Sequence, residues 1–164
     1  MVETLNPRAP PKFTKVKSIG KGSFGEVFLA TSNSTGETVC IKEVNLRGLS
    51  PKDIKHSMAE VAVLKKLQHP HIIAYRGSFR DQSAGTLGIV MEYAAGGDLG
   101  SLISKRAKEK KRFSEAEILK FCAQLFQALA YCHADLHLLH RDLKRATERL
   151  EPRAAQSSLF EELL

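Results

Sequence analysis

Residues 20–27 read Gly-Lys-Gly-Ser-Phe-Gly-Glu-Val, with three glycines in the spacing G-x-G-x-x-G. Runs of β-prone residues flank this segment at 16–19 and 26–30, so the glycines lie between two strands. A dinucleotide-binding fold would place the motif between a strand and a helix instead. The pattern therefore favours a glycine-rich hairpin whose backbone N–H groups can lie over phosphates, and the alternative is the same hairpin with no ligand.

Strand and turn signals continue beyond the hairpin. Turn-forming residues at 33–36 lead into a third strand at 38–44, and two further strands are predicted at 72–79 and 87–93. Because short turns join the first three strands, we expect these strands to pair antiparallel.

Three helices are predicted around and after these strands. The first begins at Ser50-Pro51, since serine caps a helix and proline is tolerated in its first turn, and the pattern stops at His69-Pro70. A linker at 94–97 precedes a short helix at 98–104, and Ser114-x-x-Glu117 is a capping box that opens a longer one. The apolar stripes consist of Ile54, Met58, Val61, Leu64 and Leu67 in the first helix, and of Ile118, Phe121, Cys122, Leu125, Leu129 and Cys132 in the third.

The composition excludes several classes of protein. With 43% apolar and 26% charged residues among 164, the chain can bury a core and is neither wholly disordered nor collagen-like. No run approaches the roughly 18 apolar residues of a membrane span, and the N-terminal stretch is polar, so we expect no membrane span and no secretory signal. We therefore expect an intracellular chain in which Cys40, Cys122 and Cys132 are reduced thiols.

The net charge of +7 comes mostly from one segment. Residues 105–112 (KRAKEKKR) carry six bases and one acid, a local charge of +5 that leaves +2 for the rest of the chain. No aromatic residue interleaves with these bases, as base stacking would require, so nucleic acid is not the expected partner. We expect a solvated loop or helix end, with nucleic acid or an acidic partner as the alternative.

Lys42 ends the otherwise apolar strand Val39-Cys40-Ile41-Lys42. Its neighbours at alternate positions point inward, so its ammonium group needs a partner or an anion. Glu60 is the natural partner, because it lies four residues before Leu64 and flanks the buried face of the first helix. The alternative is a solvated lysine and an ordinary helical glutamate.

The string His140-Arg141-Asp142-Leu143-Lys144 is the most specific signal, since it arises by chance in fewer than about one in a thousand chains of this length. Together with the glycine segment, Lys42 and Glu60, it makes the chain resemble the eukaryotic protein kinases from Phe13 to Lys144. The resemblance implies an α+β fold with a small lobe of five antiparallel strands and one helix, followed by the first helices of an incomplete large lobe. The expected divisions are an N-terminal extension at 1–12, the small lobe at 13–93, the large-lobe start at 94–144 and an unrelated tail at 145–164.

The hinge region resembles that of one subfamily of the protein kinases. Residues 91–99 read MEYAAGGDL and are similar to the hinge of the NIMA-related (Nek) serine/threonine kinases. The long turn before Leu87 and the lysine-rich stretch before Phe113 are similar to the same subfamily.

The family resemblance also implies a role for each site residue. The glycine loop would cover the phosphates of ATP, Lys42 would hold the α and β phosphates, and Glu60 would fix Lys42. Asp142 would accept the proton of the substrate hydroxyl, and Lys144 would support the transferred phosphoryl group. The residues expected at ATP are Ile19, Gly20, Lys21, Gly22 and Gly25 of the loop, Val27 and Cys40 over the adenine, Lys42, the gatekeeper Met91, and the backbone of Glu92 and Ala94.

The chain departs from the family pattern after Lys144. The pattern continues P-x-x-N, whereas this chain has Arg145 and Thr147, and residues 145–164 contain neither D-F-G nor A-P-E. The asparagine and the D-F-G aspartate bind Mg²⁺ in kinases, so we assign no metal ligand. A shifted reading frame, a retained intron or a truncated gene model would give such an abrupt end. A weaker alternative is a zinc site built from Cys132, His133, His137 and His140.

We therefore expect a NIMA-related serine/threonine kinase by descent, with ATP and Mg²⁺ as the family's cofactors, an undefined protein substrate and no activity in this chain. One alternative is a non-catalytic ATP-binding or protein-interaction module, and another is a basic protein that binds through residues 105–112. We expect ATP binding to be weak and nearly independent of Mg²⁺. We also expect the stripe of the third helix to be exposed and to require a covering partner.

Overall fold

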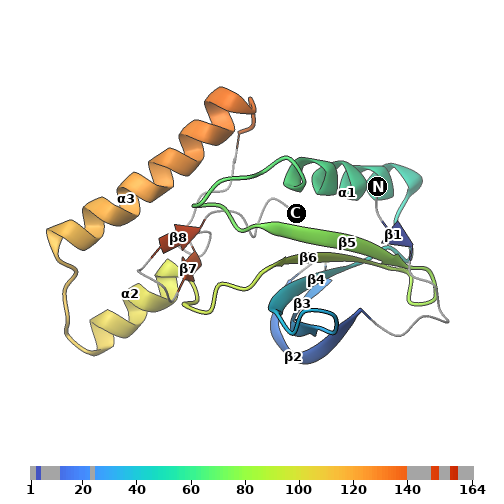
Figure 1. Ribbon diagram of the computed structural model, residues 1–164, viewed down its shortest axis with the longest axis horizontal. Coiled ribbons are helices and arrows are strands. Elements are labelled where there is room, and N and C mark those ends of the chain that lie inside the picture. The colour runs from blue at the N-terminus through green and yellow to red at the C-terminus, as the bar shows by residue number, and fades with distance from the viewer. Residues whose placement is uncertain (1–2, 5–11, 23–24, 140–148, 152–155, 159–164) are drawn as a thin grey trace. The chain divides into compact units, whose positions relative to one another are not determined.

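A six-stranded sheet forms the framework of the first part of the chain (Figure 1). The structure is a computed structural model that describes residues 3–4, 12–22, 25–139, 149–151 and 156–158. The strands lie in the order β1-β5-β6-β4-β3-β2, so β4 is flanked by β3 and β6. Their bounds are β1 Glu3–Thr4, β2 Phe13–Gly22, β3 Gly25–Ser32, β4 Thr38–Asn45, β5 Tyr75–Asp81 and β6 Thr86–Glu92. Strands β2 to β6 pair antiparallel, which confirms the predicted five-strand sheet.

The sequence does not predict the sixth strand. β1 lies in the expected N-terminal extension and pairs parallel with β5, where Glu3 lies opposite Phe79 and Thr4 opposite Arg80. A strand of two residues has no periodic pattern to detect, and its partner is distant in the sequence.

Helix α1 (Pro51–Leu64) begins where the sequence predicts. The Ser50 Oγ accepts a hydrogen bond from the Asp53 N–H at 3.2 Å, as an N-cap does, and Pro51 is the first helical residue. The predicted continuation toward His69-Pro70 is wrong. The helix ends at Leu64, and the Lys66 N–H donates to the Val63 carbonyl at 2.9 Å, a three-residue step that tightens the chain into a turn. Leu67 is buried from the loop that follows, which explains why the apolar spacing continues past the helix.

Strand β5 begins at Tyr75, later than the predicted Ile72. Ile72 and Ile73 are buried, but the Ile72 N–H donates to the His69 carbonyl at 3.1 Å in a turn. Their apolar character therefore reflects burial in a loop and not strand pairing.

The chain separates into two compact units, one formed by residues 1–66 and 74–93 and the other by residues 67–73 and 94–164. The second unit contains α2 (Leu99–Lys108), α3 (Glu115–Ala130), a π-helical turn (Tyr131–Asp135) and the antiparallel hairpin of β7 (Arg149–Glu151) and β8 (Gln156–Ser158). Among the helices described, none is long and apolar enough to cross a lipid bilayer.

Both helices of the second unit begin at side-chain caps. The Asp98 Oδ1 accepts from the Ser101 N–H at 2.8 Å at the start of α2, and the predicted capping box of Ser114 and Glu117 is present at the start of α3. α2 runs past Ser104 to Lys108, because the bases in its last turn are favourable next to the negative end of the helix dipole.

The apolar core of the first unit lies on both faces of the sheet. On one face Ala30, Val39, Ile41 and Val90 form a buried cluster, against which Phe13 and Phe79 pack. On the other face the buried side chains are Cys40, Leu87, Ile89 and Met91, each at most 4% exposed.

Candidate functional site

Side chains from β3, β4 and β6 align in two adjacent rows on one face of the sheet. The strand register sets Val27, Lys42 and Ile89 opposite one another in one row. Residues two apart on a strand point to the same side, so the row that contains Cys40 faces the same way as the row that contains Lys42. We call this surface the Lys42 face; its residues are Val27, Lys42 and Ile89 in one row and Leu29, Cys40 and Met91 in the other.

This register brings together four residues that the sequence analysis assigned to the site, Val27, Cys40, Lys42 and Met91. It also adds Leu29 and Ile89, which the sequence analysis missed. The alternation along each strand is a signal that could have found both, once the pairing of the strands was known.

The Lys42 face combines an apolar surface with one cation. Cys40 and Met91 are 4% and 2% exposed, so their row is apolar and the half-buried Leu29 is its most exposed member. Lys42 is half-buried in the next row, about 7 Å away along β4. Such a surface can pack against a planar apolar ring while the ammonium group meets an anion attached to that ring.

The glycine segment forms the predicted hairpin. β2 and β3 pair up to Gly22 opposite Gly25, and Gly20 lies opposite Val27 of the Lys42 face. The register slips by one residue between Ser18 and Gly20, so Ile19 is an irregularity in the ladder and stays 40% exposed. Lys21 lies opposite Glu26 near the end of the hairpin. The intervening Ser23 and Phe24 lie outside the described residues.

Helix α1 lies against the same face of the sheet as Lys42. The Lys65 ammonium at its C-terminal end lies 5.9 Å from the ring centre of Tyr75, and Tyr75 lies opposite Met91. Glu60 is one turn before Leu64 in this helix, but its side chain lies outside the part of the chain that the structure describes. The pairing of Lys42 with Glu60 therefore stays a prediction.

The opposite face of the sheet carries its own lysine. The Lys15 Nζ lies 2.6 Å from the Glu43 Oε2 and 4.2 Å from the ring centre of Phe28. Glu43 follows Lys42 directly and points to the other side of β4. Lys15 is thus neutralised away from the Lys42 face, which makes it a matched control for Lys42.

The end of β6 is fixed by reciprocal hydrogen bonds. The Glu92 N–H donates to the Ala74 carbonyl at 2.9 Å, and the Glu92 Oε2 accepts from the Ala74 N–H at 3.1 Å. Ala94 begins the second unit, and its carbonyl accepts from the Gly97 N–H at 3.1 Å. The expected contacts of the Glu92 and Ala94 backbone with adenine remain predictions.

The expected catalytic residues Asp142 and Lys144 lie outside the described residues, as does His140 of the alternative zinc site. Within the described ranges, no three histidine, cysteine, aspartate or glutamate side chains gather in a way that could hold a metal ion. Cys132 is fully buried, and burial raises the pKa of its thiol, as suits a core residue.

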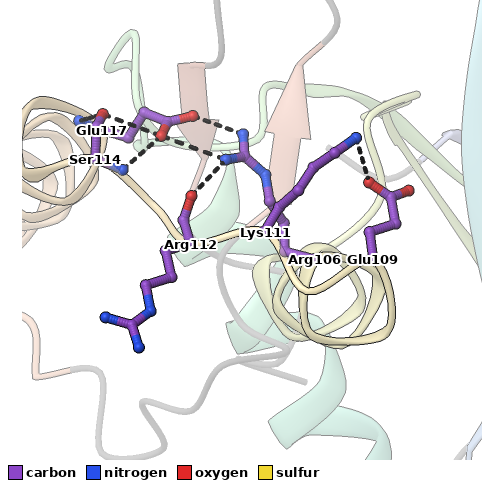
Figure 2. A network of polar contacts seen from close by, with 6 residues as sticks. All are labelled: Arg106, Glu109, Lys111, Arg112, Ser114 and Glu117. Carbon is purple, nitrogen blue, oxygen red and sulfur yellow. Dashed lines mark hydrogen bonds and ion pairs between the residues drawn. The ribbon is translucent and has the colours of Figure 1, made fainter.

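The basic segment is a helix end followed by a loop, as the sequence predicts. Its first residues form the last turn of α2, and Arg106 is half-buried (Figure 2). The Arg106 Nη2 lies 2.6 Å from the Glu117 Oε1, its Nη1 donates to the Arg112 carbonyl at 3.2 Å, and its guanidinium lies 4.7 Å from the ring centre of Phe113. The other residues of the segment are exposed, as expected for a solvated loop or helix end, and the half-buried Arg106 ties the loop between α2 and α3 to the start of α3.

Glu117 is held ionised by this network. Hydrogen bonds from the Ser114 N–H first, and then from Arg106 and the Ser114 hydroxyl, lower the pKa of the Glu117 carboxyl from 4.5 to about 2. The carboxylate therefore stays charged under all ordinary conditions.

Part of the apolar stripe of α3 is exposed. Ile118 is 50% exposed, whereas Phe121 is buried and Leu125 and Leu129 are half-buried, so the expectation of an exposed stripe is wrong for Phe121. Leu119 and Phe126, which the predicted stripe did not include, are 60% and 65% exposed.

The sequence matches the family described as Protein kinase domain over residues 13–147. The match covers most of the chain and includes the glycine hairpin, α1 and every residue of the Lys42 face. The chain belongs to the protein kinase family. The kinase match extends to residue 147, slightly past Lys144, where the sequence analysis placed its end.

Several relatives of this kinase chain are named as Nek kinases, in line with the hinge sequence. The chain is 43% identical to the probable serine/threonine-protein kinase nek3 of Dictyostelium discoideum over 133 residues, which cover 81% of this chain and 12% of that protein. It is 41% identical to the serine/threonine-protein kinase Nek1 of Mus musculus, over 81% of this chain and 11% of that protein. It is 35% identical to the serine/threonine-protein kinase Nek2 of Mus musculus over 149 residues, 88% of this chain and 34% of that protein. The chain thus spans about a third of Nek2 and about a tenth of the other two.

Proposed function

We propose that this kinase chain binds ATP at the Lys42 face, with the adenine against the row of Leu29, Cys40 and Met91 and the phosphates at Lys42 beneath the glycine hairpin. The alignment of buried Cys40 and half-buried Lys42 on one face carries this proposal. A purine is planar and largely apolar, and its phosphates are anionic, so both parts of the nucleotide find complementary groups one row apart.

The reaction proposed for the family is transfer of the γ-phosphoryl group to a serine or threonine hydroxyl of a protein, in line with the names of the relatives. In this chain Asp142 would accept the proton of that hydroxyl, and Lys144 would support the phosphoryl group. Bound Mg²⁺ supplies neutralisation of the phosphate charge in kinases. The residues of this chain do not fit Mg²⁺, because residue 147 is threonine and residues 145–164 contain no D-F-G. We therefore propose that a polypeptide of this sequence binds ATP without transferring its phosphate.

A second function, that of a protein-interaction module, is favoured by the exposed Leu119 and Phe126 of α3.

The three cysteines are free thiols, which suits the reducing interior of the cell.

A titration with a fluorescent ATP analogue tests nucleotide binding. We expect saturable binding whose Kd changes less than about twofold between excess Mg²⁺ and EDTA, since the expected metal ligands are missing. Lys42→Met should weaken binding about tenfold or more, because a hydrogen bond to a charged group contributes about 1.5–3 kcal/mol.

Lys15→Met is the matched control, since Lys15 lies on the opposite face and its substitution should leave the Kd unchanged. Equal losses in the two variants would overturn the assignment of the Lys42 face, because they would point to a general effect of positive charge. Tight binding that depends on Mg²⁺ would overturn the assignment of a site without a metal.

A further inference from the structure

Ser114 lies two residues after the basic segment and directly before α3. Lys110, Lys111 and Arg112 occupy the positions four, three and two residues before it, and all three side chains are exposed. The hydroxyl-bearing residue is itself exposed. A run of bases thus precedes an accessible serine at a fixed short distance.

The backbone is extended at Ser114 itself, whereas the bases begin in a turn, where Lys110 has φ 54° and the Lys111 N–H donates to the Arg106 carbonyl at 2.9 Å. Residues 111–114 belong to neither helix nor strand, and Ser114 has φ −72° and ψ 158°, which is extended backbone. Because residues 111–114 lie outside both helices, a substrate cleft can take them up without unwinding α2 or α3.

We propose that Ser114 is a phosphorylation site for a protein kinase whose substrate groove is acidic. The basic side chains of residues 110–112 supply the charge that such a groove selects. The partner of the basic segment would be this acidic groove, whether or not this chain binds a nucleotide.

The nearby serines lack this combination. Ser101 lies within α2 and follows Asp98, whose carboxylate accepts from both its N–H and its hydroxyl. Ser104 also lies within α2, where its hydroxyl donates to the Gly100 carbonyl at 2.9 Å. The Ser114 N–H and hydroxyl also donate to a carboxylate, that of Glu117, at 2.8 and 3.0 Å. The run of bases sets Ser114 apart, since the four residues before Ser101 and the four before Ser104 contain no lysine or arginine.

The reaction exchanges one phosphate bond for another. The Ser114 Oγ attacks the γ-phosphorus of ATP, the new O–P bond forms, and the bond from the γ-phosphorus to the β,γ-bridging oxygen breaks. ADP leaves, and the hydroxyl proton passes to the catalytic base of the modifying kinase. ATP is the only co-reactant required.

A phosphate on Ser114 would enter an existing charge network. The Ser114 Oγ lies 3.0 Å from the Glu117 Oε2, and that same oxygen lies 3.4 Å from the Arg106 Nη1 (Figure 2). The phosphate would bring a charge of about −2 beside the carboxylate, which repels it, and within reach of the guanidinium, which attracts it. We expect Arg106 to turn from Glu117 toward the phosphate, so that modification reorganises the start of α3.

The test is phosphorylation of the full chain by the catalytic subunit of cyclic-AMP-dependent protein kinase, with Mg²⁺-ATP and site mapping by mass spectrometry. We expect Ser114 to be the main phosphorylated residue. Ser114→Ala should abolish this phosphopeptide, and Ser101→Ala should leave it unchanged. Simultaneous replacement of Lys110, Lys111 and Arg112 by alanine should lower the initial rate about tenfold or more.

Ser114→Ala removes both the helix cap and the phosphate acceptor. Ser114→Thr is the second variant, since threonine keeps both a capping oxygen and an acceptor hydroxyl. Phosphate on residue 114 of this variant is the expected result. Phosphorylation of other serines with none at Ser114, or an unchanged rate in the triple alanine variant with a native melting curve, would overturn the proposal.

Discussion

Gly25 lies so close to the backbone carbonyl of Glu43 that no side chain fits between β3 and β4 at this point. A Cβ atom on Gly25 would overlap the carbonyl oxygen and carbon of Glu43. A Cβ atom on Gly20 would meet only the side chain of Val27, at 3.7 Å. The last glycine of the G-x-G-x-x-G segment is therefore required by strand packing, whereas the first has room for a Cβ atom in ordinary contact with Val27.

Gly25→Ala should lower the free energy of unfolding by about 1–3 kcal/mol, the usual cost of forcing extra volume against a backbone that cannot yield. Gly20→Ala is the matched control and should change stability by less than half as much. Urea unfolding followed by circular dichroism measures both values. Equal stability of the two variants would contradict the close approach of Gly25 to β4.

The three thiols should differ in reactivity. Cys40 and Cys132 are buried, and burial raises the pKa of the Cys132 thiol, so little thiolate is present to react at pH 7. Cys122 is only half-buried. Iodoacetamide should therefore label Cys122 first in the native chain and all three cysteines in urea, as mass spectrometry of the peptides would show. Fastest labelling of Cys132 would contradict its burial.

The Glu117 network predicts a pH dependence of stability. The pKa of the Glu117 carboxyl is lowered from 4.5 to about 2, by the Ser114 N–H and then by Arg106 and the Ser114 hydroxyl. Because the folded-state pKa lies below the unfolded one, the stabilisation is fully present above about pH 4.5 and is lost as the pH falls toward 2. The melting temperature of the chain should therefore exceed that of Glu117→Gln at pH 6, and this difference should shrink between pH 4.5 and 2.

The variant Arg106→Leu separates the contribution of Arg106 to the lowered pKa of Glu117 from the contribution of Ser114. It removes the guanidinium but keeps the N–H of Ser114, so the pKa of Glu117 should rise and still stay below its ordinary value. An NMR titration of the Glu117 carboxyl measures this. Added salt should weaken only the Arg106 part, since exposed charges are screened. A Glu117 pKa that is unchanged in Arg106→Leu would show that the ion pair contributes nothing.

Local signals in the sequence were sufficient for most elements of the fold. The caps at Ser50 and Ser114 depend on one side chain and the next turn of backbone, so they can be read directly from sequence. The end of α1 and the start of β5 could not be read in this way, because Leu67 and Ile72 are buried from loops and mimic the apolar spacing of a helix or a strand.

The candidate site required information that a single strand does not contain. The sequence placed Lys42 and Cys40 on the same side of one strand, but Leu29 and Ile89 join them only through the pairing of β4 with β3 and β6. Arg106 and Glu117 are eleven residues apart, too far for a helical spacing rule, and the turn between α2 and α3 brings them together. Long-range register and turn geometry therefore account for what the sequence analysis missed.

The exposed side chains of α3 predict self-association. Leu119 and Phe126 are seven residues apart, two helical turns, so they lie on one side of α3, and Ile118 lies beside them. In the part of the chain that the structure describes, these side chains are 50–65% exposed, and contiguous apolar surface of this kind drives association in water.

Light scattering of the purified chain should show oligomers. The double variant Leu119→Ser/Phe126→Ser should shift them toward monomer with an unchanged melting temperature. Phe121→Ser is the control, since Phe121 is only 9% exposed and its loss should lower the melting temperature without reducing association. A wild-type chain that stays monomeric at high concentration would show that another surface covers this side of the helix.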